Sequence, residues 1–195
     1  MCEIKRNERG VIMKAIMISI KPKWCAKIMN GEKTIEIRKN KALATAIQKL
    51  IDEYGYADIY VYCSKDGELF YNPSTKKWLA TKSRNIKKVH RLSNGVVKFK
   101  FRCYKVEEIG MWNYSEYGTP TLMENSLCIY SCLNFLELRD YIKDKPAYAI
   151  HISDLEIFDE PKELSEFNHS GRTIDWCLFP LERAPQNFCY VEVSL

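Results

Sequence analysis

The sequence has 195 residues, of which 46% are hydrophobic and 28% charged, and a formal net charge of +5 at pH 7. This apolar content excludes an intrinsically disordered chain, and the length fits one domain, for which we expect residues 13–195 after an N-terminal extension of residues 1–12. No apolar run reaches the roughly 18 residues of a membrane span, and the first residues lack the apolar stretch of a signal peptide, so we expect a cytoplasmic protein without membrane contact.

The first predicted elements are a strand and a short helix. Residues Ala15–Ile20 are apolar and rich in β-branched side chains, which favours a strand. Pro22 stands where the first turn of a helix tolerates proline, and Gly31 supplies a left-handed stop after a helix over Lys23–Asn30. We therefore predict a strand followed directly by a helix.

Residues 34–38 predict a second strand, because isoleucines alternate with polar residues along it. In such a strand, every second side chain lies on the buried face. The polar side chains of Thr34, Glu36 and Arg38 are therefore expected to point the same way.

A helix and two hairpins are predicted next. Apolar residues at helical spacing predict a helix over Leu43–Tyr54. Short turns that each contain one glycine, residues 65–67 (KDG) and 93–95 (SNG), stand between Ile59–Cys63 and Glu68–Tyr71 and between Val89–Leu92 and Val96–Val106, the pattern of β-hairpins. Both hairpins fit a barrel.

The last third of the sequence predicts one helix and three strands. For residues Tyr114–Cys132 two interpretations remain, a lid or an irregular connection. Asn134 is expected to cap a helix that ends at Ile142, with Glu137 completing a capping box. The predicted strands are Ala147–Ile152, Leu155–Phe158 and Phe188–Val193.

The eight cysteines are interpreted as reduced thiols, because the chain is long and carries no export signal. Zinc sites usually draw on two closely spaced pairs of ligands. Only Cys128 and Cys132 are closely spaced, and the histidines are scattered. We therefore expect neither a metal site nor a cofactor.

Two runs near the N-terminus resemble the opening of ASCH domains: residues 18–24 (ISIKPKW) and residues 28–39 (IMNGEKTIEIRK). Residues 151–155 (HISDL), 161–167 (PKELSEF) and 184–191 (APQNFCYV) resemble the larger, often prophage-associated members of that family. The resemblance implies an α+β fold, a PUA-like β-barrel with flanking helices, and a cleft over the first helix and the second strand.

For activity, the resemblance implies several possibilities. Related barrels bind RNA, one small ASCH group hydrolyses acetylated cytidine, and another is reported as a ribonuclease. In the amidohydrolases the matching strand reads Gly-x-Lys-Thr-x-Thr, and its lysine and second threonine take part in catalysis. Lys33 matches the lysine, but Glu36 replaces the threonine, so the expected nucleophile is absent. Whether the chain is an enzyme stays open, with Lys33 and Glu36 as the catalytic candidates.

Positive charge is concentrated in the first half of the sequence. Residues 1–105 carry 24 Lys and Arg against 9 Asp and Glu, whereas residues 106–195 carry 6 against 16. This asymmetry indicates either a face that binds a polyanion or a solvated surface whose charges interleave in the fold.

A ligand site beside the second strand is predicted from the side chains that a base or phosphate requires. Lysine and arginine supply donors, aromatic rings stack bases, and amides read base edges. The candidates are Lys21, Trp24, Lys33, Thr34, Glu36, Arg38, Lys39, His151 and Gln186. The alternatives are a surface ion pair for Glu36 and Arg38, core packing for Trp24 and a structural hydrogen bond for His151.

These patterns favour a module that binds RNA or a nucleoside-like ligand. The first alternative is a hydrolase that acts on a modified nucleoside, as in the acetylcytidine amidohydrolases, or a ribonuclease. A second alternative is a phage-type accessory protein that binds a host protein or a small signalling molecule, with the protein partner unknown.

Overall fold

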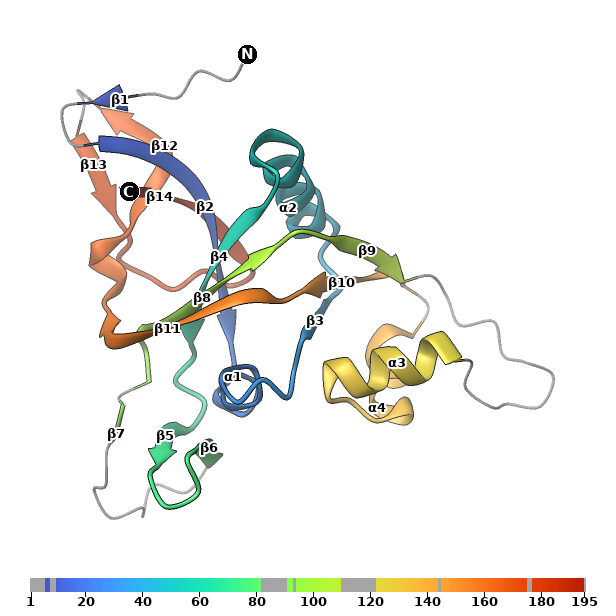
Figure 1. Cartoon of the computed structure of the whole chain (residues 1–195). Coiled ribbons are helices and arrows are strands. Elements are labelled where there is room, and N and C mark those ends of the chain that lie inside the picture. The colour runs from blue at the N-terminus through green and yellow to red at the C-terminus, as the bar shows by residue number, and fades with distance from the viewer. Residues whose placement is uncertain are drawn as a thin grey trace.

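The computed structural model describes residues 6–7, 10–81, 91–92, 94–109, 122–143, 145–174 and 177–194. Within these residues the strands form one eight-stranded sheet and two three-stranded sheets, accompanied by four α-helices and one 3-10 helix (Figure 1). The fold is therefore α+β, as predicted from the sequence.

The largest sheet has the strand order β11-β8-β4-β2-β14-β12-β13, and β1 pairs with β2. Its strands are β1 (Arg6–Asn7), β2 (Gly10–Ile20), β4 (Ala57–Cys63), β8 (Val97–Cys103), β11 (Ser153–Lys162), β12 (Asn168–Ile174), β13 (Cys177–Pro180) and β14 (Phe188–Ser194). β2 and β4 are parallel, and the other pairs are antiparallel. β11 and β13 are the strands at the two ends of this order, and among the described residues they do not pair with each other.

One face of this sheet is covered by the first two helices, α1 (Pro22–Met29) and α2 (Lys41–Tyr54). β4 lies inside the sheet between β2 and β8 and is buried at all seven positions. Ile18, Ile47 and Phe99 are fully buried where the helices meet the strands. This core fixes α1 directly after the end of β2.

The opposite face packs against the segment that contains the 3-10 helix η1 (Leu164–Glu166). Met17 and Tyr60 project from the sheet toward Phe167 and Leu181 in a second buried cluster. The rings of Tyr60 and Phe167 meet edge to face, with centroids 5.0 Å apart.

A second sheet, of order β3-β10-β9, carries the predicted site strand. Its strands are β3 (Ile35–Arg38), β9 (Val106–Ile109) and β10 (Ala147–His151), and α3 (Leu122–Ser131) and α4 (Phe135–Ile142) pack against it. Their shared core consists of Ile35, Ile37, Ile109, Leu127, Leu138, Ile142, Ala147 and Ala149. In Figure 1, α3 and α4 lie on the opposite side of α1 from the third sheet.

The third sheet, called the arm below, consists of β5 (Glu68–Asn72), β6 (Lys77–Thr81) and β7 (Arg91–Leu92), with β5 in the middle and Leu69 of β5 buried in the main core. Both predicted hairpins are therefore wrong: β4 pairs with β2 and β8, whereas β5 pairs with β6 and β7. Both edges of the fully buried β4 are paired with neighbouring strands of the large sheet. No edge of β4 is therefore left for pairing with β5.

Three helix predictions are confirmed. α1 and α2 occupy the predicted segments, and Gly55 ends α2 with a left-handed φ of 83°. Before α4, the side chain of Asn134 accepts from the Glu137 backbone, and the Glu137 side chain accepts from the Asn134 backbone. No described helix has both the length and the apolar character to cross a membrane.

Several boundaries differ from those predicted. β2 begins at Gly10, inside the predicted extension, and the division at residue 13 stays a prediction. The predicted strand Val96–Val106 is divided between β8 and β9, which belong to different sheets. Of the segment Tyr114–Cys132, residues 122–131 form α3, and residues 110–121 lie outside the described residues.

Candidate ligand-binding cleft

The turn between α1 and β3 directs Lys33 into the interior. Gly31 has a left-handed φ of 72°, which is strained for residues with a Cβ, and this ends the helix. The backbone N–H groups of Glu32 and Lys33 both donate to the Lys27 carbonyl, at 2.9 and 3.1 Å. The chain therefore folds back beneath α1, and the Lys33 side chain is only 3% exposed.

Lys33, Glu36 and Arg38 form a charge network on the floor of a cleft. Lys33 Nζ lies 3.3 Å from Glu36 Oε2, and Arg38 Nε donates to Glu36 Oε1 at 2.9 Å. Arg38 Nη2 also donates to the Ser19 carbonyl at 2.8 Å, which connects β3 to the end of β2. Because the Glu36 side chain is 9% exposed, both cations bind a carboxylate that water hardly reaches.

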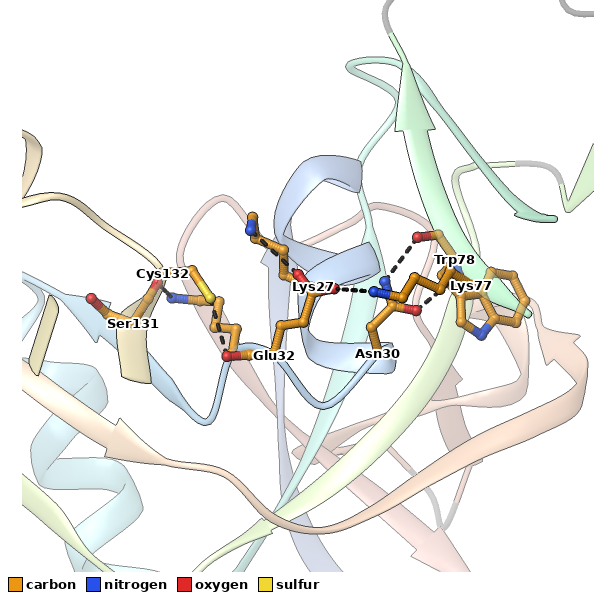
Figure 2. Close-up of polar contacts among 8 residues, drawn as sticks. Lys27, Asn30, Glu32, Lys77, Trp78, Ser131 and Cys132 are labelled. Carbon is orange, nitrogen blue, oxygen red and sulfur yellow. Dashed lines mark hydrogen bonds and ion pairs between the residues drawn. The ribbon is translucent and has the colours of Figure 1, made fainter. Parts of the chain in front are cut away.

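The network is also bound to the end of α3. Lys33 Nζ donates to the Ser131 carbonyl at 2.9 Å and to the Ile35 carbonyl at 2.8 Å. Beside it, Cys132 Sγ donates to the Glu32 carbonyl at 3.1 Å (Figure 2). The ammonium of Lys33 therefore faces three acceptors, two carbonyls and a carboxylate.

Burial lowers the pKa of Lys33, and the neighbouring Glu36 carboxylate opposes this effect. An amine acts as a nucleophile or base only through a free lone pair. Here its three donor positions are matched by three acceptors, so the geometry suits a fixed cation that orients Glu36. Among the described residues, no three His, Cys, Asp or Glu side chains are grouped to hold a metal ion.

On the other side of the turn, Asn30 holds the third sheet against α1. Its Nδ2 donates to the Trp78 carbonyl at 2.9 Å, and its Oδ1 accepts from the Trp78 N–H at 2.8 Å (Figure 2). Glu32 lies between Lys27 and Lys77, 3.5 Å from each ammonium. The arm and α3 therefore bind the same short turn from two sides.

Replacing Asn30 by alanine is expected to lower the free energy of unfolding by about 2 kcal/mol, because both backbone groups of Trp78 lose their partner in a partly buried place. Urea denaturation followed by tryptophan fluorescence measures the change. Gln48→Ala, which removes an exposed side-chain contact to Asp52, is the control and should change the free energy far less. Equal effects of the two substitutions would contradict this role of Asn30.

The cleft above the charge network has a volume of about 490 Å³. Its aromatic side chains are Trp24 from α1 and Tyr141 from α4. The Lys33 ammonium lies 5.1 Å from the centre of the Trp24 ring, and that of Lys23 lies 4.5 Å from it. The other lining residues are Ser19, Ile20, Lys21, Lys33, Glu36, Ile37, Arg38, Ser64, Asp66, Leu133, Glu137 and Gln186.

The structure brings most of the predicted site residues together in this cleft. The residues concerned are Lys21, Trp24, Lys33, Glu36, Arg38 and Gln186. Lys39 lines an adjoining hollow with Arg38 and Tyr141. Thr34 is exposed and does not line the cleft, and its backbone binds the Tyr130 carbonyl and the Ile152 N–H.

His151 lies away from the cleft lining, beside a different carboxylate. Its Nε2 is 2.6 Å from Glu107 Oε2, while Lys105 Nζ is 2.7 Å from Glu107 Oε1. Hydrogen bonds from Lys105 and His151 lower the pKa of Glu107. This arrangement is the structural hydrogen bond that stood as the alternative for His151.

Sequence reasoning did not include Tyr141 and Glu137 in the site. Both lie on α4, four residues apart, and therefore on one face of the helix. That spacing was the available signal. It could not show that this face meets β3, because the contact depends on how α4 packs against the second sheet.

No family model and no curated protein matches this sequence. Solved structures are similar in fold. The ASCH protein of Zymomonas mobilis is 16% identical with a TM-score of 0.48, covering 90% of this chain and 86% of its own. A mutant of that protein has 17% identity, a TM-score of 0.47 and coverages of 90% and 87%. The N-terminal domain of Staphylothermus marinus McrB has 9% identity, a TM-score of 0.40 and 77% coverage of both chains. These are similarities of fold alone.

Proposed function

We propose that this chain is a PUA-like module that holds a base of RNA or a nucleoside-like ligand in the cleft between α1, β3 and α4. One observation carries this proposal: Arg38 and Glu36, the latter held by Lys33, lie on the floor of a cleft that also contains two aromatic side chains. The volume of about 490 Å³ falls within the range of small-molecule sites.

The chemistry of the lining suits the edge of a base. The bonds of Arg38 to Glu36 and Ser19 use Nε and Nη2, which leaves Nη1 as a donor. Gln186 offers both a donor and an acceptor from the loop before β14. Trp24 and Tyr141 provide ring surfaces for stacking.

Charge in the cleft is balanced. Lys21, Lys33 and Arg38 are matched by Glu36, Asp66 and Glu137 among the lining residues. A balanced lining with several hydrogen-bonding groups favours a polar, uncharged group, as a nucleobase is, over a phosphate.

Replacing Arg38 by lysine is expected to weaken binding about tenfold, because lysine keeps the charge but loses the planar fork that bonds Glu36 and Ser19 and faces the ligand. Fluorescence titration with single-stranded RNA and with nucleosides measures the affinity. Melting temperatures recorded alongside should fall, since the same bonds connect β3 to β2.

Arg102→Lys is the matched control for Arg38→Lys. Arg102 also pairs with a carboxylate, Asp58 at 3.3 Å, but it is 40% exposed and does not line the cleft. Its substitution should leave affinity unchanged. Equal affinities of the wild type, Arg38→Lys and Arg38→Ala would remove Arg38 from the site, and no saturable binding of any ligand at low salt would remove the proposed function.

A second candidate function is hydrolysis of a modified nucleoside or of RNA, favoured by the contact of Lys33 with Glu36 in the cleft. Glu36 would act as a general base, with Lys33 as the cation beside it. Incubation with acetylcytidine and with labelled RNA, comparing the wild type with Glu36→Gln, tests this. Products formed by the wild type and lost in the variant would establish a hydrolase; intact substrates in both reactions would exclude it for these substrates.

A further inference from the structure

A second hollow adjoins the cleft and differs from it in charge. It has a volume of about 340 Å³ and is lined by Arg38, Lys39, Asn40, Leu43, Tyr141 and Asn187. Arg38 and Tyr141 line both spaces, so the cleft and the hollow are neighbours across these two side chains. Consecutive residues of one loop are divided between them, with Gln186 in the cleft and Asn187 in the hollow.

The side chains that line the hollow include two basic groups and no acidic group. Arg38 and Lys39 line it, and no aspartate or glutamate does. The cleft, by contrast, matches its cations with carboxylates, as described above. Arg38 shares the Glu36 carboxylate with Lys33, whereas the Lys39 ammonium has no carboxylate partner among the described residues, so the hollow has an excess of positive charge. Such an excess attracts an anion, and phosphate oxygens are acceptors that a guanidinium and an ammonium both bind well.

The donors of the hollow are available to a ligand. Lys39 is exposed, and in the described part of the chain its ammonium has no carboxylate partner, lying instead 4.8 Å from the centre of the Tyr141 ring. The Asn40 side chain uses its oxygen to accept from the Leu43 N–H at 3.1 Å, so its amide nitrogen remains as a donor. Arg38 is held in place by Glu36 and Ser19 while it lines both spaces.

We propose that the ligand carries a phosphate group, bound in this hollow by Arg38 and Lys39, while its base lies in the cleft. This rests on the proposed function and narrows it: the bound species is a nucleotide, either free or within an RNA strand, and a nucleoside without phosphate is a poorer ligand. The shared side chains, Arg38 and Tyr141, mark where the sugar connects the two groups.

The test compares ligands that differ only in phosphate. Dissociation constants are measured by calorimetry for the four ribonucleosides, for their 3′- and 5′-monophosphates and for a short single-stranded RNA. At least one monophosphate is expected to bind about tenfold tighter than its nucleoside, because it adds charge-assisted hydrogen bonds. Tighter binding of the RNA than of every monophosphate would assign the phosphate to a strand, and the reverse would assign it to a free nucleotide.

Lys39→Ala provides the decisive variant, and Lys49→Ala provides its control. Lys49 is exposed on α2, lines neither space, and its loss changes the net charge equally. Lys39→Ala should weaken binding of the preferred monophosphate about fivefold and leave nucleoside binding unchanged. It should also reduce the slope of the logarithm of RNA affinity against the logarithm of salt concentration by the amount expected for about one phosphate contact. Lys49→Ala should do neither.

The outcomes separate this inference from the proposed function. Equal affinity for nucleosides and monophosphates, together with no effect of Lys39→Ala, would overturn the phosphate site while leaving base binding in the cleft intact. Weakening of nucleoside and monophosphate by the same factor in Lys39→Ala would also overturn it. If none of these probes binds, the proposed function is overturned, and the phosphate site with it.

Discussion

Replacing Lys33 by methionine is expected to lower the free energy of unfolding by about 3 kcal/mol at pH 7, the largest effect that we expect of a single substitution. Methionine fills much the same space but lacks the ammonium. The carbonyls of Ile35 and Ser131 and the carboxylate of Glu36 would each lose a donor, all in a place that water hardly reaches. Arg38 would remain as the one described partner of Glu36, which limits the loss.

Lys27→Met is the matched control for Lys33→Met, because Lys27 flanks the same turn and also faces a glutamate. Its partner Glu32 is 3.5 Å away, and the two side chains are 33% and 38% exposed, so water screens the pair. We expect a change of no more than about 1 kcal/mol. Urea denaturation of both variants measures the two values, and similar values would show that burial adds nothing to the Lys33 contacts.

A double-mutant cycle assigns the effect to the charge network. If Lys33→Met acts by leaving Glu36 with less compensation, then Glu36→Gln should be less destabilising in the Lys33→Met background than in the wild type. Additive effects of the two substitutions would mean that Lys33 acts through the carbonyls of Ile35 and Ser131 alone.

Local structure could be predicted well where a few neighbouring residues determine it. Pro22 at the first turn of α1, Gly55 after α2 and the Asn134–Glu137 capping box all act through contacts within one turn of their own helix. Such signals are complete in the sequence. These three helices, α1, α2 and α4, were therefore predicted with ends close to those observed.

Strand pairing could not be predicted in the same way. The turns after β4 and before β8 contain glycines with positive φ, Gly67 and Gly95, as hairpin turns often do. The partners are nevertheless decided by burial: β4 is buried at every position and lies between β2 and β8, while β5 leaves the large sheet for the arm. A short run of residues does not indicate which of several distant strands will pair with a given edge of the sheet.

The candidate site shows the same division between local and distant information. Alternation along residues 34–38 placed Glu36 beside Arg38, and the structure has them bonded. The burial of Lys33 depends on Ser131 at the end of α3, in a segment whose sequence gave no clear element. Tyr141 enters the cleft because α4 packs on the second sheet. Contacts of this kind follow from the assembled fold.

A second large effect is expected at Lys98, on β8, which is 1% exposed and lies beside the thiols of Cys25 and Cys63. Burial lowers its pKa from 10.5 to about 8, and the two cysteines oppose this shift. Between these two values the unfolded chain keeps the proton that the native protein has lost. The unfolded state then binds more protons, so the contribution of this group to stability rises with pH.

The free energy of unfolding of the wild type minus that of Lys98→Met should therefore rise between about pH 8 and pH 10.5, by up to about 3 kcal/mol. Taking the difference removes the titration of groups that both proteins share, such as Cys103, whose pKa burial raises to about 11. Urea denaturation at pH 7, 8, 9 and 10 measures it.

Two further variants decide whether the buried ammonium of Lys98 causes this rise. Lys100→Met lies two residues along the same strand, where the side chain is 21% exposed and the ammonium is 3.1 Å from Glu156, so it tests the effect of removing a less deeply buried and paired lysine from β8. Because the sulfur of Cys63 also titrates beside Lys98, the comparison is repeated in a Cys63→Ala background. A rise that persists without Cys63 and is absent for Lys100→Met assigns the titration to Lys98. A difference that stays constant from pH 7 to 10 would mean that the Lys98 ammonium keeps its proton in the native protein throughout this range, because some partner compensates for its burial.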